Sequence, residues 1–261
     1  MGSSLVVGSP GFYYTHNSAG SREDSDPPLI LIHGAGGSHL HWSPTTRRLS
    51  GRNTYAIDLP GHGRSPGDAL RTIPEYVEVL ASWIKHEAIR RPVLIGHSMG
   101  GAIALSAGLT IPEALAGLVL VGTSDHLPVN PTLLGMLGRD ETFTQAVDLI
   151  MKWSFSPSSA PRLLELCRKR MLQVPRLVLF SDYRACEQFD VQGRLGEIRL
   201  PTLVICGADD KMTPARAVRR LAQSIADSRL AIIEAAGHMV MLEQPPAVDE
   251  AVLDFLAREA L

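Results

Sequence analysis

The sequence predicts an α/β fold, with a mainly parallel sheet of eight strands, helices on both faces and a helical cap. Short apolar runs of strand length alternate with segments of helical periodicity along most of the chain. Such alternation is typical of parallel strands joined by helices that cover both faces of the sheet. One stretch, residues 124–196, breaks it. We therefore expect a core domain formed by residues 1–123 and 197–261, with a cap of residues 124–196 inserted in it.

The strands and helices are expected in the following order. A hairpin opens the chain, because apolar residues 5–7 and 12–15 flank a Gly- and Pro-containing turn, and a polar loop follows it. Buried strands are then predicted at residues 29–32, 53–57, 92–95, 118–121, 202–206 and 230–233. Helices are predicted at residues 73–87, 99–110, 214–225 and 246–259. The carboxyl ends of such parallel strands are where active groups gather.

The composition narrows the classes of protein that this chain can be. Of its 261 residues 45% are hydrophobic, which is enough for a large core, and α/β folds of this length often form one domain. The net charge is −2 with acids and bases mixed, which argues against nucleic-acid or anionic-membrane partners. The three cysteines are widely spaced and are expected to be reduced. The N-terminus shows no basic segment followed by an apolar one, as a signal peptide would, and no apolar run approaches the length of a membrane span. A cytoplasmic protein is therefore expected.

The segment Gly96-His97-Ser98-Met99-Gly100-Gly101 is the most informative motif. An apolar strand leads into it and a small-residue helix leads out. A Gly-x-Ser-x-Gly in that setting forms a sharp, strained turn that holds the serine hydroxyl clear of the sheet. Ser98 is therefore the candidate nucleophile.

A serine nucleophile needs a base in contact, and strand–turn–helix serine enzymes follow the chain order Ser, acid, His. Of the nine histidines, His238 lies far downstream of Ser98 and follows the strand at 230–233. It is the candidate base. The acid should also follow a strand, which leaves Asp209 and Asp210 after residues 202–206 and Asp125 after residues 118–121.

Acyl transfer also needs N–H donors for a developing oxyanion. The N–H that follows the nucleophile belongs to Met99, and the second donor is expected in the glycine-rich loop after residues 29–32. We assign it to Ala35, with Gly36 as the neighbouring alternative.

The stretch 124–196 is rich in Leu, Met, Phe and Trp at helical spacing and is punctuated by prolines. Most of these apolar residues are expected to serve packing. A minority should line a substrate pocket over Ser98, and the candidates are Met136, Met151, Trp153 and Phe155.

No metal or cofactor is expected. His39 and His41 are two histidines without a third ligand at workable spacing. The chain has no phosphate-binding loop, no G-x-G-x-x-G after a strand and no Cys-x-x-Cys.

Five segments together resemble the α/β-hydrolase family, in the family's order and over nearly the whole chain: His33-Gly34, Asp58–Ser65, Gly96–Gly101, Gly207–Pro214 and Gly237-His238. The resemblance is to small bacterial carboxylesterases and to cofactor-free haloperoxidase-like serine hydrolases. It implies that Asp210 is the triad acid, since the family pattern is Gly-x-x-Asp followed by Pro four residues later.

The resemblance further implies hydrolysis of short- to medium-chain carboxylic esters through an acyl-enzyme, with a small-molecule ester as the partner. One scaffold hosts many reactions, so the same Ser-His-Asp set could instead serve a C–C bond hydrolase or a lyase of small metabolites. A binding module with an intact but slow triad is the third hypothesis.

Overall fold

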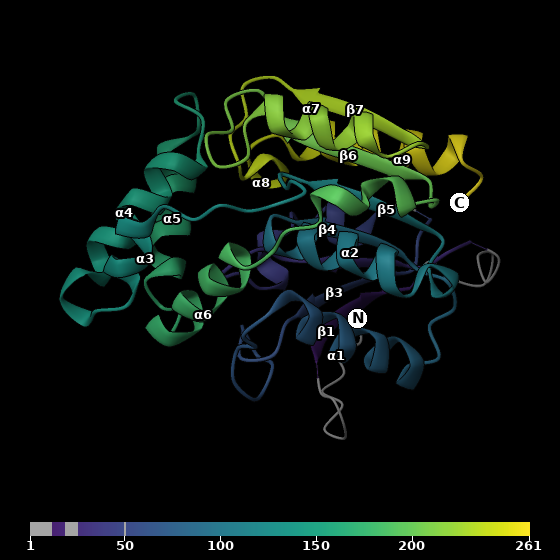
Figure 1. The fold of residues 1–261 in the computed structure, drawn as a ribbon. Coiled ribbons are helices and arrows are strands. Elements are labelled where there is room, and N and C mark those ends of the chain that lie inside the picture. The colour runs from purple at the N-terminus through teal and green to yellow at the C-terminus, as the bar shows by residue number, and fades with distance from the viewer. Residues whose placement is uncertain (1–11, 19–25, 50) are drawn as a thin grey trace.

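A computed structural model describes residues 12–18, 26–49 and 51–261 of the chain. In these residues seven strands form one sheet in the order β1-β3-β2-β4-β5-β6-β7 (Figure 1). Every neighbouring pair is parallel except β1 and β3. The strands are β1 (Tyr13–Asn17), β2 (Leu29–Ile32), β3 (Thr54–Asp58), β4 (Val93–His97), β5 (Gly117–Val121), β6 (Thr202–Gly207) and β7 (Ser228–Ile233). The expected fold class is confirmed. The strand predicted at residues 5–7, which would be the eighth, lies outside the described residues.

The buried core is split by the sheet into two clusters because successive side chains of a strand point to opposite faces. In β2, Ile30 and Ile32 belong to one cluster, while Leu29 and Leu31 belong to the other. The first cluster is closed by helices α1 (Ile73–His86), α2 (Met99–Thr110) and α7 (Ala215–Ser224). The second is closed by α9 (Pro245–Arg258) and by residues of the 124–196 stretch. The sheet is therefore covered on both faces, as predicted.

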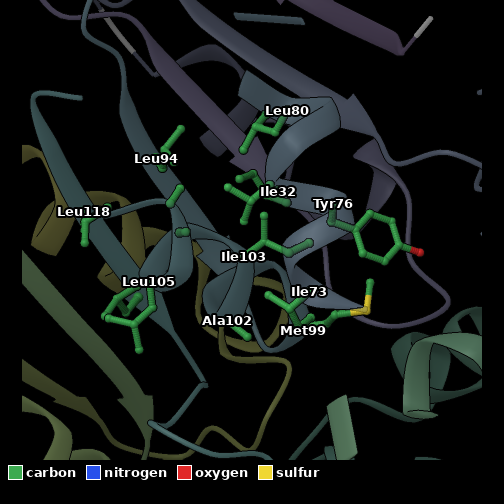
Figure 2. Packing of buried hydrophobic residues seen from close by; sticks show 14 of the residues in the cluster. Ile32, Ile73, Tyr76, Leu80, Leu94, Met99, Ala102, Ile103, Leu105 and Leu118 are labelled. Atoms are coloured by element: carbon green, nitrogen blue, oxygen red, sulfur yellow. The ribbon is translucent and has the colours of Figure 1, made fainter. Parts of the chain in front are cut away.

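Helix α1 begins at a capping box, in which the Thr72 hydroxyl accepts from the Glu75 N–H and the Glu75 carboxylate accepts from the Thr72 N–H. One turn later Tyr76 lies fully buried in the first cluster. Figure 2 shows its ring beside Met99 and Ile73, with the phenolic oxygen directed away from the other labelled side chains. The helix start thus fixes the position of a buried hydroxyl that bears on the site described below.

The 124–196 stretch contains the helices α3 (Pro131–Leu137), α4 (Phe143–Ser154), α5 (Pro161–Met171) and α6 (Arg176–Glu187). They gather at one end of the sheet, drawn in teal and green in Figure 1. His126 and Asp190, near the two ends of the stretch, form an antiparallel bridge. This brings the chain leaving β5 next to the chain returning toward β6.

Across the described ranges, no helix is both long and apolar enough to span a bilayer.

Candidate active site

Ser98 lies at the turn between β4 and α2 with φ 52° and ψ −114°, a conformation that L-residues rarely adopt. Its backbone N–H donates to the carbonyl of Val121 at 2.8 Å, which ties the turn to β5. A Cβ added to Gly96 would collide with the backbone of Gly100, and one added to Gly100 would collide with that of Ile32. The glycines on both sides of Ser98 are therefore required by the crossing of strand and helix. Such backbone strain is common at active sites.

Asp210 and His238 are joined by a hydrogen bond of 2.9 Å from His238 Nδ1 to Asp210 Oδ2, and both residues are buried. Each residue lies in a loop after a strand, β6 and β7 respectively. The Thr213 hydroxyl donates to the same Oδ2 at 2.7 Å, and the N–H groups of Met212 and Thr213 donate to Oδ1 at 2.8 and 2.9 Å. Thr213 is a partner that the sequence did not single out.

The surroundings of Asp210 keep its carboxylate ionised. Burial by itself would raise the pKa of Asp210, but the neighbouring His238 and the donors of Thr213 outweigh it and lower that pKa. An ionised carboxylate on Nδ1 holds the proton on that nitrogen and leaves Nε2 of His238 as the acceptor.

The two other candidate acids lie elsewhere. Asp209 accepts a hydrogen bond of 2.6 Å from the Ser156 hydroxyl. Asp125 contacts Ser124 and His126 at 2.9 and 3.0 Å, and Arg220 at 3.5 Å. Of the three aspartates, the structure brings Asp210 to His238.

The loop after β2 carries the candidate oxyanion donors. In the described residues neither the Ala35 nor the Met99 backbone N–H has a hydrogen-bond partner. The N–H of Gly36, the alternative donor, is already bonded at 2.7 Å to the carboxylate of Asp182 on α6. This leaves Ala35 and Met99 as the unoccupied pair.

A cavity of about 380 Å³ lies over Ser98. Both Ser98 and His238 line it, and within the described residues the Ser98 hydroxyl has no hydrogen-bond partner. Contacts between nucleophile and base are often loose without substrate. Most of the apolar lining of the cavity comes from the loop after β5, from the 124–196 helices and from the loops after β6 and β7. These residues are Leu127, Pro128, Val129, Leu133, Ile150, Trp153, Met171, Met212 and Met239.

Of the four residues expected in the pocket, Trp153 lines this cavity. The other three, Met136, Met151 and Phe155, do not line it but pack in or against the second core cluster. For Met151 the physical reason is the rotation of α4: Ile150 and Trp153 are three residues apart and share the helix face that lines the cavity, and Met151 lies on a different face.

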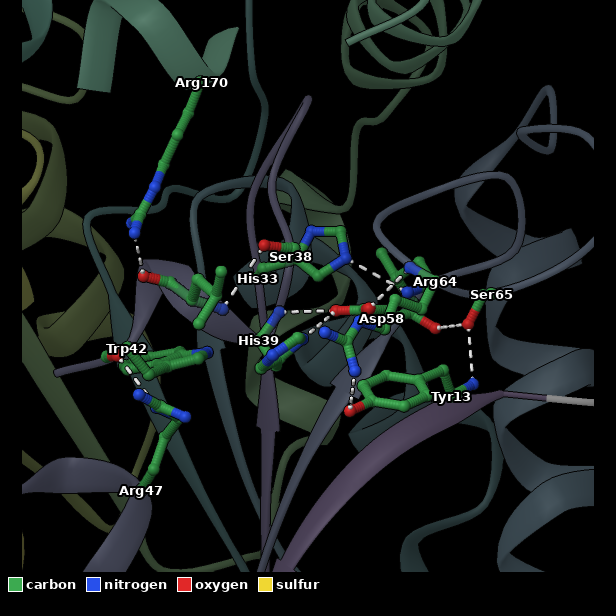
Figure 3. Close-up of polar contacts among 12 residues, drawn as sticks. Tyr13, His33, Ser38, His39, Trp42, Arg47, Asp58, Arg64, Ser65 and Arg170 are labelled. Atoms are coloured by element: carbon green, nitrogen blue, oxygen red, sulfur yellow. Dashed lines mark hydrogen bonds and ion pairs between the residues drawn. The ribbon is translucent and has the colours of Figure 1, made fainter. Parts of the chain in front are cut away.

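The two histidines considered as metal ligands have other surroundings. His39 donates from its backbone N–H and from Nδ1 to Asp58 Oδ1 at 2.6 and 2.8 Å, and Arg64 N–H donates to the other oxygen (Figure 3). This organises the segment 58–65. His41 lines the cavity, and its Nδ1 is buried without a hydrogen-bond partner in the part of the chain that the structure describes. Among the residues that the structure describes, no three His, Cys, Asp or Glu side chains are grouped to hold a metal ion.

Comparison with known proteins agrees with this geometry. The profile of the α/β hydrolase family matches residues 29–251. A 2-hydroxy-6-oxononadienedioate/2-hydroxy-6-oxononatrienedioate hydrolase of Klebsiella pneumoniae is 30% identical over 258 residues, covering 90% of this chain and 88% of the relative. The pimeloyl-acyl-carrier-protein methyl ester esterase of Nitrosomonas europaea is 30% identical over 235 residues, covering 84% and 91%.

Among solved structures, that of a thermophilic esterase is similar with a TM-score of 0.82 and 32% sequence identity, covering 95% of this chain and 94% of that one. The profile match spans most of the chain, and the sheet order, the strand–Ser98–helix turn and the loops after β6 and β7 fit it. The protein belongs to the α/β hydrolase family and is a hydrolase.

Proposed function

We propose that the protein is a serine hydrolase that cleaves short- to medium-chain carboxylic esters through an acyl-enzyme. One observation carries the proposal: the bonded pair Asp210–His238 meets the strained Ser98 at one cavity, at the carboxyl ends of the parallel strands β4, β6 and β7. This is the set of roles that acyl transfer needs, namely a nucleophile, a base and a group that orients the base.

In the proposed reaction, Ser98 Oγ attacks the ester carbonyl carbon while Nε2 of His238 takes its proton. The carbonyl oxygen becomes an oxyanion, which accepts hydrogen bonds from the free N–H groups of Ala35 and Met99. When the intermediate collapses, His238 gives the proton to the departing alcohol and Ser98 is acylated. Water, deprotonated by His238, then attacks the acyl-enzyme; as this second intermediate collapses, His238 returns the proton to Ser98 Oγ and the carboxylic acid is released. Asp210 stabilises the imidazolium in both halves.

The residues 124–196 are proposed to act as a cap on the core domain of residues 1–123 and 197–261. Helices α3 to α6 contribute Leu133, Ile150, Trp153 and Met171 to the cavity wall, while the proposed chemistry resides in the core. A cavity of about 380 Å³ lies at the lower end of the range for small-molecule pockets, which favours short acyl chains.

The test is hydrolysis of a panel of p-nitrophenyl esters by wild-type protein and by Ser98→Ala. Loss of a triad nucleophile costs on the order of a million-fold in kcat. A fluorophosphonate probe should label Ser98 and no other serine by peptide mapping. Ser224→Ala on α7, whose hydroxyl bonds to the Arg220 carbonyl, is the matched control and should keep full activity. A pure Ser98→Ala protein with a tenth of the wild-type activity would refute the proposal.

Hydrolysis of a C–C bond is the second candidate, and the similarity to the Klebsiella hydrolase favours it. That relative is named for a 2-hydroxy-6-oxo dioate, a ketone whose hydrolysis breaks a carbon–carbon bond. Turnover of a vinylogous diketone, together with poor turnover of every ester in the panel, would select this candidate over the esterase.

A further inference from the structure

Asp182 is a fully buried carboxylate on α6 that has no role in the proposed chemistry. Its Oδ2 accepts two hydrogen bonds of 2.7 Å, one from the backbone N–H of Gly36 and one from Nε2 of His62. Its Oδ1 accepts one of 3.1 Å from the hydroxyl of Tyr76 on α1. One side chain of the 124–196 stretch therefore holds the loop after β2, the loop after β3 and α1 together.

The hydrogen bonds of His62 define its charge. Its Nδ1 lies 2.9 Å from the Pro60 carbonyl oxygen and its Nε2 lies 2.7 Å from the Asp182 carboxylate. Both partners are acceptors, so both ring nitrogens donate and the ring is an imidazolium. Burial alone would lower the pKa of His62, but the charge and hydrogen bond of Asp182 outweigh it and raise that pKa.

The other titratable groups around His62 are compatible with this charge. Asp58 adds a further negative charge that favours the imidazolium. The His33 ring, 4.9 Å away, is neutral: its Nδ1 donates to the Gly34 carbonyl and its Nε2 accepts from the Leu59 N–H. His41 is also kept neutral, since burial lowers its pKa to about 4. A buried ion pair is costly unless its hydrogen bonds are complete, and these are.

Gly36 is held by α6 in a second way. Its φ is +62°, and a Cβ there would lie 2.6 Å from Cδ1 of Leu179, one turn before Asp182 on α6. The Gly36 N–H and the Ala35 carbonyl share one peptide plane, so the bond to Asp182 fixes that plane. The candidate oxyanion donor, the N–H of Ala35, is one Cα away from it.

We propose that Asp182, charge-paired with His62, is a positioning residue that locks the oxyanion loop to α6 and thereby presets the Ala35 N–H for the oxyanion. The inference rests on the proposed function, since it assumes that the Ala35 N–H takes part in acyl transfer. If the proposal holds, one buried ion pair fixes both the position of α6 in the cap and the orientation of the Ala35 N–H.

The kinetic test compares Asp182→Asn with Glu187→Gln. Asn has nearly the shape of Asp, but one of its two terminal atoms is an NH₂ and it carries no charge to hold the imidazolium. Loss of one oxyanion donor costs about 10²–10³ in kcat, and loss of a group that orients a metal ligand, which serves as the analogy here, costs about 10–100-fold. We expect kcat to fall about 10–100-fold with KM within about twofold. Glu187, exposed on α6 and paired with Arg184, is the control and should leave both constants unchanged.

A second measurement does not depend on activity. In ¹⁵N NMR of the full-length protein at pH 7.5, both ring nitrogens of His62 should carry protons in the wild type, and one should have lost its proton in Asp182→Asn. The Gly36 amide proton should move upfield in the same variant as its charged acceptor is lost. His62→Gln, which keeps a donor but not the charge, should lower kcat and abolish the loss of kcat at alkaline pH that deprotonation of His62 causes in the wild type.

The outcomes separate the two proposals. An ester-hydrolysing wild type whose kcat is unchanged in a folded Asp182→Asn variant overturns this inference and leaves the proposed function intact. A neutral His62 ring in the wild type overturns it as well, whatever the activity. A wild type with the imidazolium signature that hydrolyses no ester refutes the proposed function instead.

Discussion

The imidazole of His97 donates a hydrogen bond of 2.9 Å from Nε2 to the backbone carbonyl of His238. The two rings lie 4.7 Å apart. Burial, aided by the proximity of His238, holds the pKa of His97 well below its usual value, so the ring is neutral and Nε2 carries its proton. The residue immediately before the candidate nucleophile thus supports the loop of the candidate base. Nδ1 of His97 is buried and has no hydrogen-bond partner among the described residues, so within them the ring bonds through Nε2 alone.

His97→Phe should lower kcat about tenfold with little change in KM, because an aromatic ring of similar size remains but the N–H that positions His238 is lost. The magnitude is taken by analogy with the hydrogen-bond partners of metal-binding histidines, whose loss costs about 10–100-fold. His97→Gln, which offers an amide donor in place of the imidazole N–H, should recover part of the loss. The measurement is steady-state hydrolysis of p-nitrophenyl butyrate, with the melting temperature as a check of folding. Wild-type kcat in a folded His97→Phe protein would contradict the positioning role.

Asp210→Asn should lower kcat by about four orders of magnitude, because the orienting carboxylate on His238 Nδ1 is lost. Asp209→Asn should have a mild effect, since Asp209 bonds to Ser156 and not to the imidazole. The three variants Asp209→Asn, Asp210→Asn and Asp125→Asn are compared by kcat at one saturating ester. A crippled Asp125→Asn beside a tolerant Asp210→Asn would place the acid after β5 and make the assignment wrong.

Trp153→Ala should move the preferred acyl length of the p-nitrophenyl ester series upward from its wild-type optimum, which we expect between about two and eight carbons. Each CH₂ that finds apolar cover contributes about 0.8 kcal/mol, or roughly fourfold in kcat/KM, so the activity should climb with length and drop once the cavity is full. Met151→Leu is the matched control, because Met151 lies two positions away on α4 but packs in the core. Its optimum should stay where the wild type has it. Activity that peaks on long-chain triglyceride emulsions would contradict the prediction.

Acid should destabilise the fold through buried neutral histidines before it protonates Asp210. Burial lowers the pKa of His41 to about 4, and its Nδ1 has no partner among the described residues. In the unfolded chain a histidine titrates near 6.5, so below that pH the unfolded state binds the proton and the folded state does not. The contribution of His41 is therefore full above pH 6.5 and is lost as the pH falls toward 4, by roughly 3 kcal/mol in total.

Urea unfolding at pH 4, 5, 6, 7 and 8 measures this effect. His41→Gln should flatten the pH dependence of the free energy of unfolding between pH 4 and 6.5, even if it changes the stability at pH 8. The control is His86→Gln, because His86 is exposed on α1 and is in contact with water in both the folded and the unfolded state. An unchanged slope in His41→Gln would show that the His41 ring takes up its proton in the folded state.

The sequence by itself determined the individual strands and the nucleophile turn, because these depend on patterns of residues close in the chain. Apolar runs of strand length predicted β2 to β7 within two residues at each end, and α2 has the predicted limits. The glycines beside Ser98 predicted its sharp turn, since the crossing of one strand and the next helix is a local matter. His238 was found by its place after the last strand, which is a property of chain order.

Only the tertiary structure decided contacts between distant segments. The sequence left Asp209, Asp210 and Asp125 open until the family resemblance favoured Asp210, and the fold then placed that carboxylate 2.9 Å from His238. At Met151 the pocket wall differed from expectation because the rotation of α4 is set by the helices packed around it, and the helix face that lines the cavity is that of Ile150 and Trp153. Asp182 and His62 are 120 positions apart, and no sequence pattern predicts that they are in contact. Such a pair cannot be predicted from the sequence because it depends on burial. A charge that folding removes from water is costly unless an opposite charge lies beside it, and only the folded structure shows which residues are buried together.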